Sequence, residues 1–222
     1  MRAAVFVIVA FAGWPACTSP VAPSATAPDR IDVLSYLVGS PETWPRRGDQ
    51  AQHQLVDTMR QEVCWTKYAN PAMFECWRWD NEWVYHVIDH GLDGGKGGSY
   101  RFTDGRWLPR WLPSDGWSLD VRDNRIRPFD LTCREEADRS FPYRLRASLV
   151  PNMDAGGDLG VRDTLVLEYR PYDPENAGVG VAEQFYFAEG AGWFLWTRAG
   201  ARVAFNRRGG PAVPALRTFC YW

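Results

Sequence analysis

The chain has 222 residues, a formal net charge of −2 and a hydrophobic content of 45%. This content supplies enough apolar side chains for a sizeable core and excludes wholesale disorder, and the length suits one β domain or at most two small ones. The near-neutral charge gives no electrostatic reason to expect binding to nucleic acid or to an anionic membrane surface.

The first seventeen residues predict an export signal rather than part of the fold. Met1-Arg2 carries a positive charge, and the apolar run at residues 3–13 (AAVFVIVAFAG) has the length of a signal-peptide core. The run is too short to remain in a bilayer as a spanning helix. Ala10-Phe11-Ala12 fits the small-x-small rule for a cleavage site.

A second cleavage site competes with the first. Trp14-Pro15-Ala16-Cys17 resembles the lipobox of bacterial lipoproteins, with Trp14 where Leu is usual. The resemblance implies that Cys17 is lipidated and that the protein meets the membrane only through this anchor. The following residues, 18–30 (TSPVAPSATAPDR), have the composition of an extended tether. Lipid anchoring in the cell envelope and plain secretion are both open at this point.

Residues 31–222 are predicted to form a single β-rich domain. The segment 31–38 (IDVLSYLV) favours a short helix, which Asp29 or Asp32 would cap and Gly39 would end. Residues 52–61 fit a helix or a strand. Beyond Glu62 the pattern favours strands at 62–68, 73–79, 82–88, 99–103, 106–111, 117–121, 143–150, 161–169, 181–188, 192–198, 201–206 and 216–222.

The connections between these strands decide the fold class. Most are short and contain Asp, Asn or Gly, which predicts antiparallel neighbours, and residues 91–98 (GLDGGKGG) predict a flexible loop. No long helical pattern separates the strands, which argues against a parallel sheet. We therefore expect an all-β antiparallel meander of about twelve strands, forming a curved barrel or a sandwich.

Residues 100–107 (YRFTDGRW) resemble residues 185–193 (FYFAEGAGW). Both segments run from an aromatic residue through Phe to an acidic residue, Gly and Trp. The similarity indicates either a duplicated hairpin or the same turn reached twice.

Removing Cys17 leaves four cysteines, an even set that suits an oxidising compartment. If two strands pair symmetrically about Asn70, Cys64 lies opposite Cys76 at disulfide distance. We therefore predict the disulfide Cys64–Cys76, which leaves Cys133 and Cys220 as the second pair. Buried free thiols are the alternative.

Two pairs of side chains are candidates for catalysis. A two-residue turn at Asp80-Asn81 would place Glu75 opposite His86, where the carboxylate could orient a general base or form a structural polar pair. Glu168 and Glu183 lie in adjacent predicted strands and would form a glycosidase pair or bind arginines.

Metal and cofactor chemistry is not expected. The Cys and His spacings fit no zinc site, and the chain has no phosphate loop or dinucleotide fingerprint. Strand alternation would put His86 and His90 on one face and Asp89 on the other, which disfavours a metal site.

The 12 Trp residues suit either a binding surface or a core in which all the indoles pack and pair strands. A single core rarely buries so many indoles, because each N–H needs a partner. We predict a ligand-binding surface formed by Trp65, Trp77, Trp79, Tyr186 and Trp196. The first hypothesis is a non-catalytic exported domain that binds a glycan. The second is a lipocalin-like or lipoprotein-carrier-like barrel for a hydrophobic small molecule, and the third is a cell-envelope hydrolase.

Overall fold

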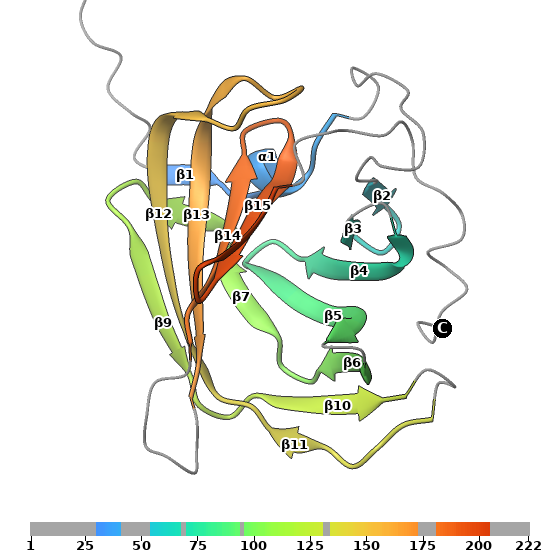
Figure 1. The fold of residues 1–222 in the computed structure, drawn as a ribbon. Helices are drawn as coiled ribbons and strands as arrows, with labels where there is room; N and C mark the ends of the chain where they lie inside the picture. The colour runs from blue at the N-terminus through green and yellow to red at the C-terminus, as the bar shows by residue number, and fades with distance from the viewer. Residues whose placement is uncertain are drawn as a thin grey trace, which may run out of the picture.

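The computed structural model describes residues 30–40, 54–67, 70–93, 96–130, 134–172 and 181–204. Within these ranges the chain forms antiparallel sheets and one short helix, an all-β arrangement of the sandwich type with no closed barrel (Figure 1). The fold class predicted from the sequence is confirmed, and the sandwich is the correct alternative. The predicted signal, most of the tether, Cys17, Cys133, Cys220 and the strand at 216–222 lie outside the described residues.

The described chain begins with β1 (Arg30–Asp32) and α1 (Leu34–Leu37). The helix is shorter than predicted because residues 30–32 pair with β8 (Trp111–Pro113). The N-cap is Val33, which makes no side-chain cap hydrogen bond, so the predicted cap at Asp29 or Asp32 is wrong; Asp32 Oδ1 instead accepts the N–H of Leu34 at 3.0 Å from one residue further back.

An eight-stranded sheet forms one layer. In order across the sheet its strands are β11 (Arg139–Ser140), β10 (Arg125–Phe129), β6 (Lys96–Phe102), β5 (Trp83–Asp93), β4 (Asn70–Trp79), β3 (Glu62–Lys67) and β2 (Gln54–Asp57), while β7 (Arg106–Pro109) also pairs with β5. The ambiguous segment 52–61 therefore contains a strand. The loop predicted at 91–98 is wrong, because Gly91 pairs with Gly98 and Asp93 with Lys96 in an extended hairpin.

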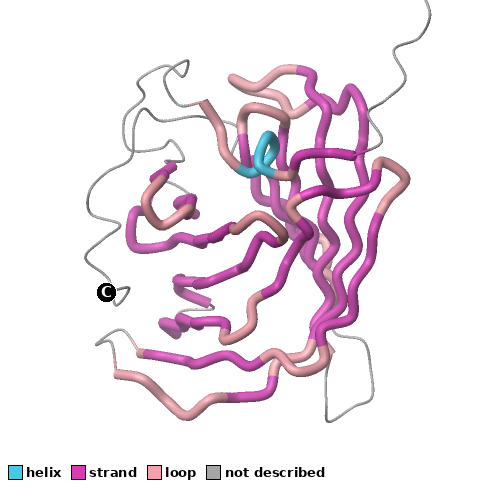
Figure 2. Tube along the Cα trace, turned by 180° about the vertical axis from the view of Figure 1, so that it is seen from behind, coloured by secondary structure: helices cyan, strands magenta, loops and turns pink. Residues whose placement is uncertain are grey.

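A six-stranded sheet forms the other layer, and within it each strand from β12 to β16 pairs with the next. Its strands are β9 (Trp117–Val121), β12 (Tyr143–Asp154), β13 (Val161–Pro171), β14 (Glu183–Ala188), β15 (Gly192–Arg198) and β16 (Ala201–Ala204). In Figure 1 these strands run upright while β4, β5 and β10 run across them, and the view from behind in Figure 2 shows the same two layers. The inner faces of the two sheets enclose the main core.

Aromatic side chains fill the centre of this core. The ring of Trp77 stacks on Trp107 with centroids 5.1 Å apart, and it meets the edges of Phe187 at 6.0 Å and Trp193 at 5.8 Å. Such offset and edge contacts stabilise beyond area burial alone.

Gly192, at φ +78°, completes the packing, since an added Cβ would lie 2.1 Å from the ring of Trp65. Trp65 in turn donates its indole N–H to Leu37 O at 3.1 Å, which ties α1 to the core.

Cys64 and Cys76 are directly opposed on β3 and β4 and form the predicted disulfide. The bond lies on the outer face of the eight-stranded sheet, packed with Phe74, Ile88 and Phe129. A cross-link that closes a loop of this length stabilises the fold by about 3 kcal/mol through the unfolded chain. Its presence indicates an oxidising environment.

Candidate functional site: an acidic cavity between the sheets

A cavity of about 70 Å³ lies between the inner faces of the two sheets. Its polar lining comes from Glu75 on β4, His86 and Asp89 on β5, and Glu183 on β14. Its aromatic lining consists of Tyr100, Phe102, Trp107, Phe141, Tyr169 and Phe185. The volume admits a few water molecules or one small polar group.

Glu75 and His86 are both buried, and Oε2 of the glutamate lies 3.2 Å from Nε2 of the histidine. The contact between these two residues is predicted correctly from the sequence, but the strand register used to predict it is wrong. Trp77, not Glu75, lies opposite His86, because the turn after β4 is wider than two residues and is closed by the N–H of Asp80 donating to Trp83 O at 2.9 Å. The shift moves β5 by two residues and so keeps its inward face, which leaves Glu75 and His86 as diagonal neighbours.

A β-bulge in β5 adds Asp89 to the site. Cys76 pairs with Ile88 and Trp77 with His86, so Val87 is the extra residue. Beyond it the alternation is reversed: Asp89 lines the cavity opposite Glu75, whereas His90 packs against Phe74. The expectation that His86 and His90 share a face, with Asp89 on the other, is therefore wrong.

Glu183 reaches the cavity from the other sheet. Its Oε2 accepts the indole N–H of Trp196 at 3.0 Å, and its Oε1 lies 3.5 Å from Nη1 of Arg198. Burial raises the pKa of Glu183; the hydrogen bond from Trp196 and the charge of Arg198 oppose this rise, while the negative charges of Glu75 and Asp89 add to it.

Glu168 does not join Glu183. The register of β13 and β14 pairs Glu168 with Gln184 and Tyr169 with Glu183, so the two glutamates point to opposite faces of the sheet. Glu168 instead lies 3.2 Å from Nη2 of Arg170. The predicted glycosidase pair is wrong, and Tyr169 takes the cavity position. Burial, with the charged groups around it, raises the pKa of Tyr169 well above its usual value.

Phe102 closes the cavity at the point where the pairing partner of β5 changes from β6 to β7. Strand β6 pairs with β5 from Ile88 onward and β7 pairs with it up to Tyr85, so neither covers the bulge. Phe102, the last residue of β6, fills this junction with its ring 4.3 Å from that of His86. Because β6 and β7 both pair with β5 rather than with each other, the segment 100–107 is not a second hairpin.

Gly105 fixes the backbone beside this junction. Its carbonyl accepts the N–H of His86 at 2.6 Å, and its φ is +66°. An added Cβ would lie 2.3 Å from His86 O, so only glycine fits.

Comparison of the chain with protein families, with curated proteins and with solved structures finds no match. Sequence reasoning missed Asp89, Tyr169 and Phe102 in the acidic cavity. Strand alternation placed Asp89 on the wrong face, and no residue in the sequence marks the bulge that moves it.

The predicted aromatic surface is only partly accessible. Trp65 and Trp77 are fully buried in the core, so neither is available to a ligand from solvent. Trp79 and Trp196 are partly buried and pack against the same core. Tyr186 is partly buried and donates its hydroxyl to Gln184 Oε1 at 2.8 Å. The prediction of an exposed surface is therefore wrong for Trp65 and Trp77.

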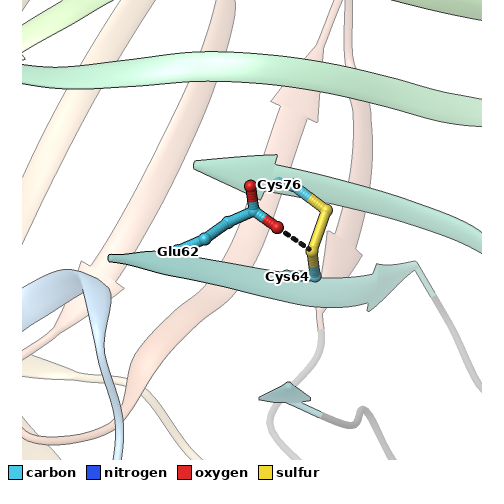
Figure 3. Close-up of side chains that lie close together, drawn as sticks. All are labelled: Glu62, Cys64 and Cys76. Atoms are coloured by element: carbon cyan, nitrogen blue, oxygen red, sulfur yellow. Dashed lines mark hydrogen bonds between the residues drawn. A yellow bond between two sulfur atoms is a disulfide. The ribbon is translucent and has the colours of Figure 1, made fainter. Parts of the chain in front are cut away.

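The described residues contain one group with metal-like spacing, formed by Glu62, Cys64 and Cys76 (Figure 3). Its two sulfur atoms are joined in the disulfide and cannot act as thiolates. Oε1 of Glu62 lies 3.8 Å from Cys64 Sγ. The acidic cavity, in contrast, brings no three ligand atoms of its acids and His86 within 4.8 Å of one another. Among the described residues, no helix is long and apolar enough to cross a membrane.

Proposed function

We propose that the protein is an exported ligand-binding domain whose acidic cavity receives a positively charged group, such as the ammonium of a small amine. The observation that carries the proposal is the convergence of Glu75, Asp89 and Glu183 on one cavity with aromatic walls. Carboxylates attract a cation through charge, and the faces of aromatic rings attract it through their quadrupole.

The electrostatics of the cavity support a cationic ligand. Carboxylates are costly to remove from water unless cations or hydrogen bonds compensate them. Here Glu75, Asp89 and Glu183 line one cavity together with His86, and Nη1 of Arg198, a half-exposed side chain, lies 3.5 Å from Oε1 of Glu183. An ammonium group in the cavity would place a positive charge beside these acids, and its N–H groups would donate to the carboxylates.

The size of the cavity argues against a glycan or a hydrophobic small molecule as its ligand. Pockets that hold a sugar or a lipid chain typically have volumes of about 300–1,000 Å³, whereas this cavity has about 70 Å³. A glycan would therefore have to bind through the partly buried Trp79, Tyr186 and Trp196. A carrier function would need an apolar cavity larger than this one.

Export is part of the proposal. The apolar N-terminal run, the tether at 18–30 and the disulfide Cys64–Cys76 all favour an oxidising, extracytoplasmic location. Attachment to the cell envelope through Cys17 and secretion without a lipid remain two forms of this proposal, and mass spectrometry of the mature N-terminus separates them.

Calorimetric titration with methylammonium tests the ligand class. We expect saturable binding by the wild type and at least ~10-fold weaker binding by Glu75→Gln, because the variant removes a buried charge that faces the ammonium. Glu168→Gln is the matched control, since Glu168 lies on the opposite sheet face, and it should bind like the wild type. Absence of saturable binding by the wild type, or equal weakening by both variants, would contradict the proposal.

A second candidate is acid–base catalysis, the third hypothesis from the sequence. It is favoured by the 3.2 Å contact between Glu75 and His86 and by the raised pKa of Glu183 across the cavity. A carboxylate-oriented imidazole suits a general base, and a carboxyl group whose pKa is raised suits a general acid. Turnover of a chromogenic ester or amide that is lost in His86→Asn but kept in Glu168→Gln would favour catalysis over binding alone.

A further inference from the structure

A second concave site lies on the outer face of the eight-stranded sheet. It is a groove of about 390 Å³ lined by Arg60, Arg78 and Arg101, with Glu62, Val87 and Phe102 completing the wall. Pockets for small molecules commonly have volumes of this order. The groove is thus several times larger than the acidic cavity.

Sheet register explains why the three arginines meet. Arg78 is two residues from Cys76 on β4 and therefore shares its outward face. Arg101 on β6 pairs with Ile88, which belongs to the same outer face. Arg60 enters from the turn between β2 and β3, where Asp57 Oδ1 accepts the Arg60 N–H at 3.1 Å. Strand pairing thus gathers three cations from distant parts of the sequence.

The groove is positively charged in a chain whose formal net charge is −2. Glu62 is the one carboxylate among the described residues of its lining; it is buried and lies opposite Arg78 in the ladder. Arg101 lies 3.2 Å from Glu135, and both side chains are about half exposed. Arg78 is exposed and makes no ion pair with another described residue. Its guanidinium is available to an incoming anion.

We propose that this groove binds the phosphate or sulfate group of a ligand that also carries an apolar body. Guanidinium groups form paired hydrogen bonds with the oxygens of such anions, which a single ammonium cannot do. Phe102 and Val87 supply apolar wall beside the arginines, and a free phosphate ion would leave most of the groove unfilled. A soluble phosphate ester and a lipid phosphate headgroup share this chemistry.

This site is separate from the acidic cavity, although Phe102 lines both. The proposal does not depend on the ligand assigned to that cavity, because the arginines lie on the outer face and the acids on the inner face. A variant of the acidic cavity should therefore leave the groove unchanged.

Calorimetric titration of the wild type with phenyl phosphate at low ionic strength tests the groove. We expect one-to-one binding that weakens as salt is added, since exposed charges are screened. Arg78→Gln should weaken binding about 10-fold or more, and the double variant Arg60→Gln/Arg78→Gln further. The matched control is Arg202→Gln, an exposed arginine on β16 of the other sheet, which should bind like the wild type.

The two sources of the ligand are separated by a parallel experiment with vesicles. Phosphatidylcholine vesicles with and without phosphatidic acid are sedimented with the protein. Binding of phenyl phosphate supports a soluble ester, and sedimentation only with phosphatidic acid supports a lipid headgroup; in either case Arg78→Gln must reduce the binding. The proposal is overturned if neither probe binds, or if Arg202→Gln weakens binding as much as Arg78→Gln. Glu75→Gln, which tests the acidic cavity, should leave phenyl phosphate binding unchanged.

Discussion

Replacing Trp77 by alanine is expected to lower the free energy of unfolding by about 3–5 kcal/mol. The indole is fully buried at the point where the two sheets meet. It stacks on His86 at 5.4 Å and on Trp107 at 5.1 Å, and both neighbours line the acidic cavity. Removing the ring would leave a hole that the surrounding strands cannot fill, because their side chains are themselves packed at the sheet interface.

Urea denaturation followed by circular dichroism measures this loss. Trp111→Ala is the control, because Trp111 is 49% exposed and its main ring contact is with the guanidinium of Arg110, at 5.5 Å. The control should lower stability by about 1 kcal/mol or less. Equal losses in the two variants would show that Trp77 does not hold the two sheets together in the way described.

Glu183→Gln is expected to stabilise the ligand-free protein at neutral pH and to weaken amine binding at the same time. Burial is the largest cause that raises the pKa of Glu183 above its ordinary value of 4.5. The folded state therefore holds this proton more tightly than the unfolded state does. The resulting stabilisation is complete below pH 4.5 and is lost as the pH rises through the folded-state pKa.

The measurement is the difference in unfolding free energy between Glu183→Gln and the wild type across this pH range. We expect the difference to grow in favour of the variant as the pH rises, by about 1.4 kcal/mol for each unit by which the folded pKa is raised. Glu168→Gln should show no such trend, because Glu168 lies on the other face of the sheet and beside Arg170. A difference that stays constant with pH would contradict the assignment of Glu183 to a buried acidic site.

Local sequence signals were sufficient to pair Cys64 with Cys76. A symmetric register about Asn70 predicts that the two cysteines face each other, and the disulfide forms there, although Asn70 itself lies in β4 and pairs with Lys67 beyond a register shift. The turn at Asp80 was predicted too narrow, because Asp80 can close either a two-residue turn or a wider one. Its Oδ1 accepts the N–H groups of Glu82 and Trp83, each at 2.7 Å, which selects the wider form. That choice depends on the surrounding sheet as well as on the local sequence.

The candidate site shows which side-chain positions can be predicted from strand alternation and which cannot. The predicted register of β4 and β5 differs from the observed one by two residues. A shift of two residues leaves every side chain on the same face of the sheet, so Glu75 and His86 are still neighbours. Asp89 is predicted on the wrong face of the strand, because Val87 is the extra residue of a bulge and the alternation is reversed after it. Bulges of this kind depend on pairing with both neighbouring strands, here β4 on one side and the β6–β7 junction on the other.

The burial of the tryptophans also could not be settled from the sequence. Both faces of β3, β4 and β15 carry apolar residues, so the alternation alone did not identify the inner face. The second sheet decides it: Trp65, Trp77 and Trp193 point toward that interface and are buried there. The outer face of β4 is occupied by the disulfide and Phe74. Strands that are apolar on both faces are therefore explained by separate buried clusters on their two faces rather than by an exposed binding surface.

The most direct test of the cation-binding cavity is a titration with methylammonium followed by the ¹⁵N NMR signals of the indole N–H groups. Trp107 lines the cavity, whereas Trp65 donates its N–H to Leu37 O at 3.1 Å and does not line it. We predict that the Trp107 signal shifts to saturation and the Trp65 signal stays fixed, and that the shift is lost in Glu75→Gln/Glu183→Gln. A Trp107 signal that does not shift, or that shifts equally in this double variant, would contradict the account.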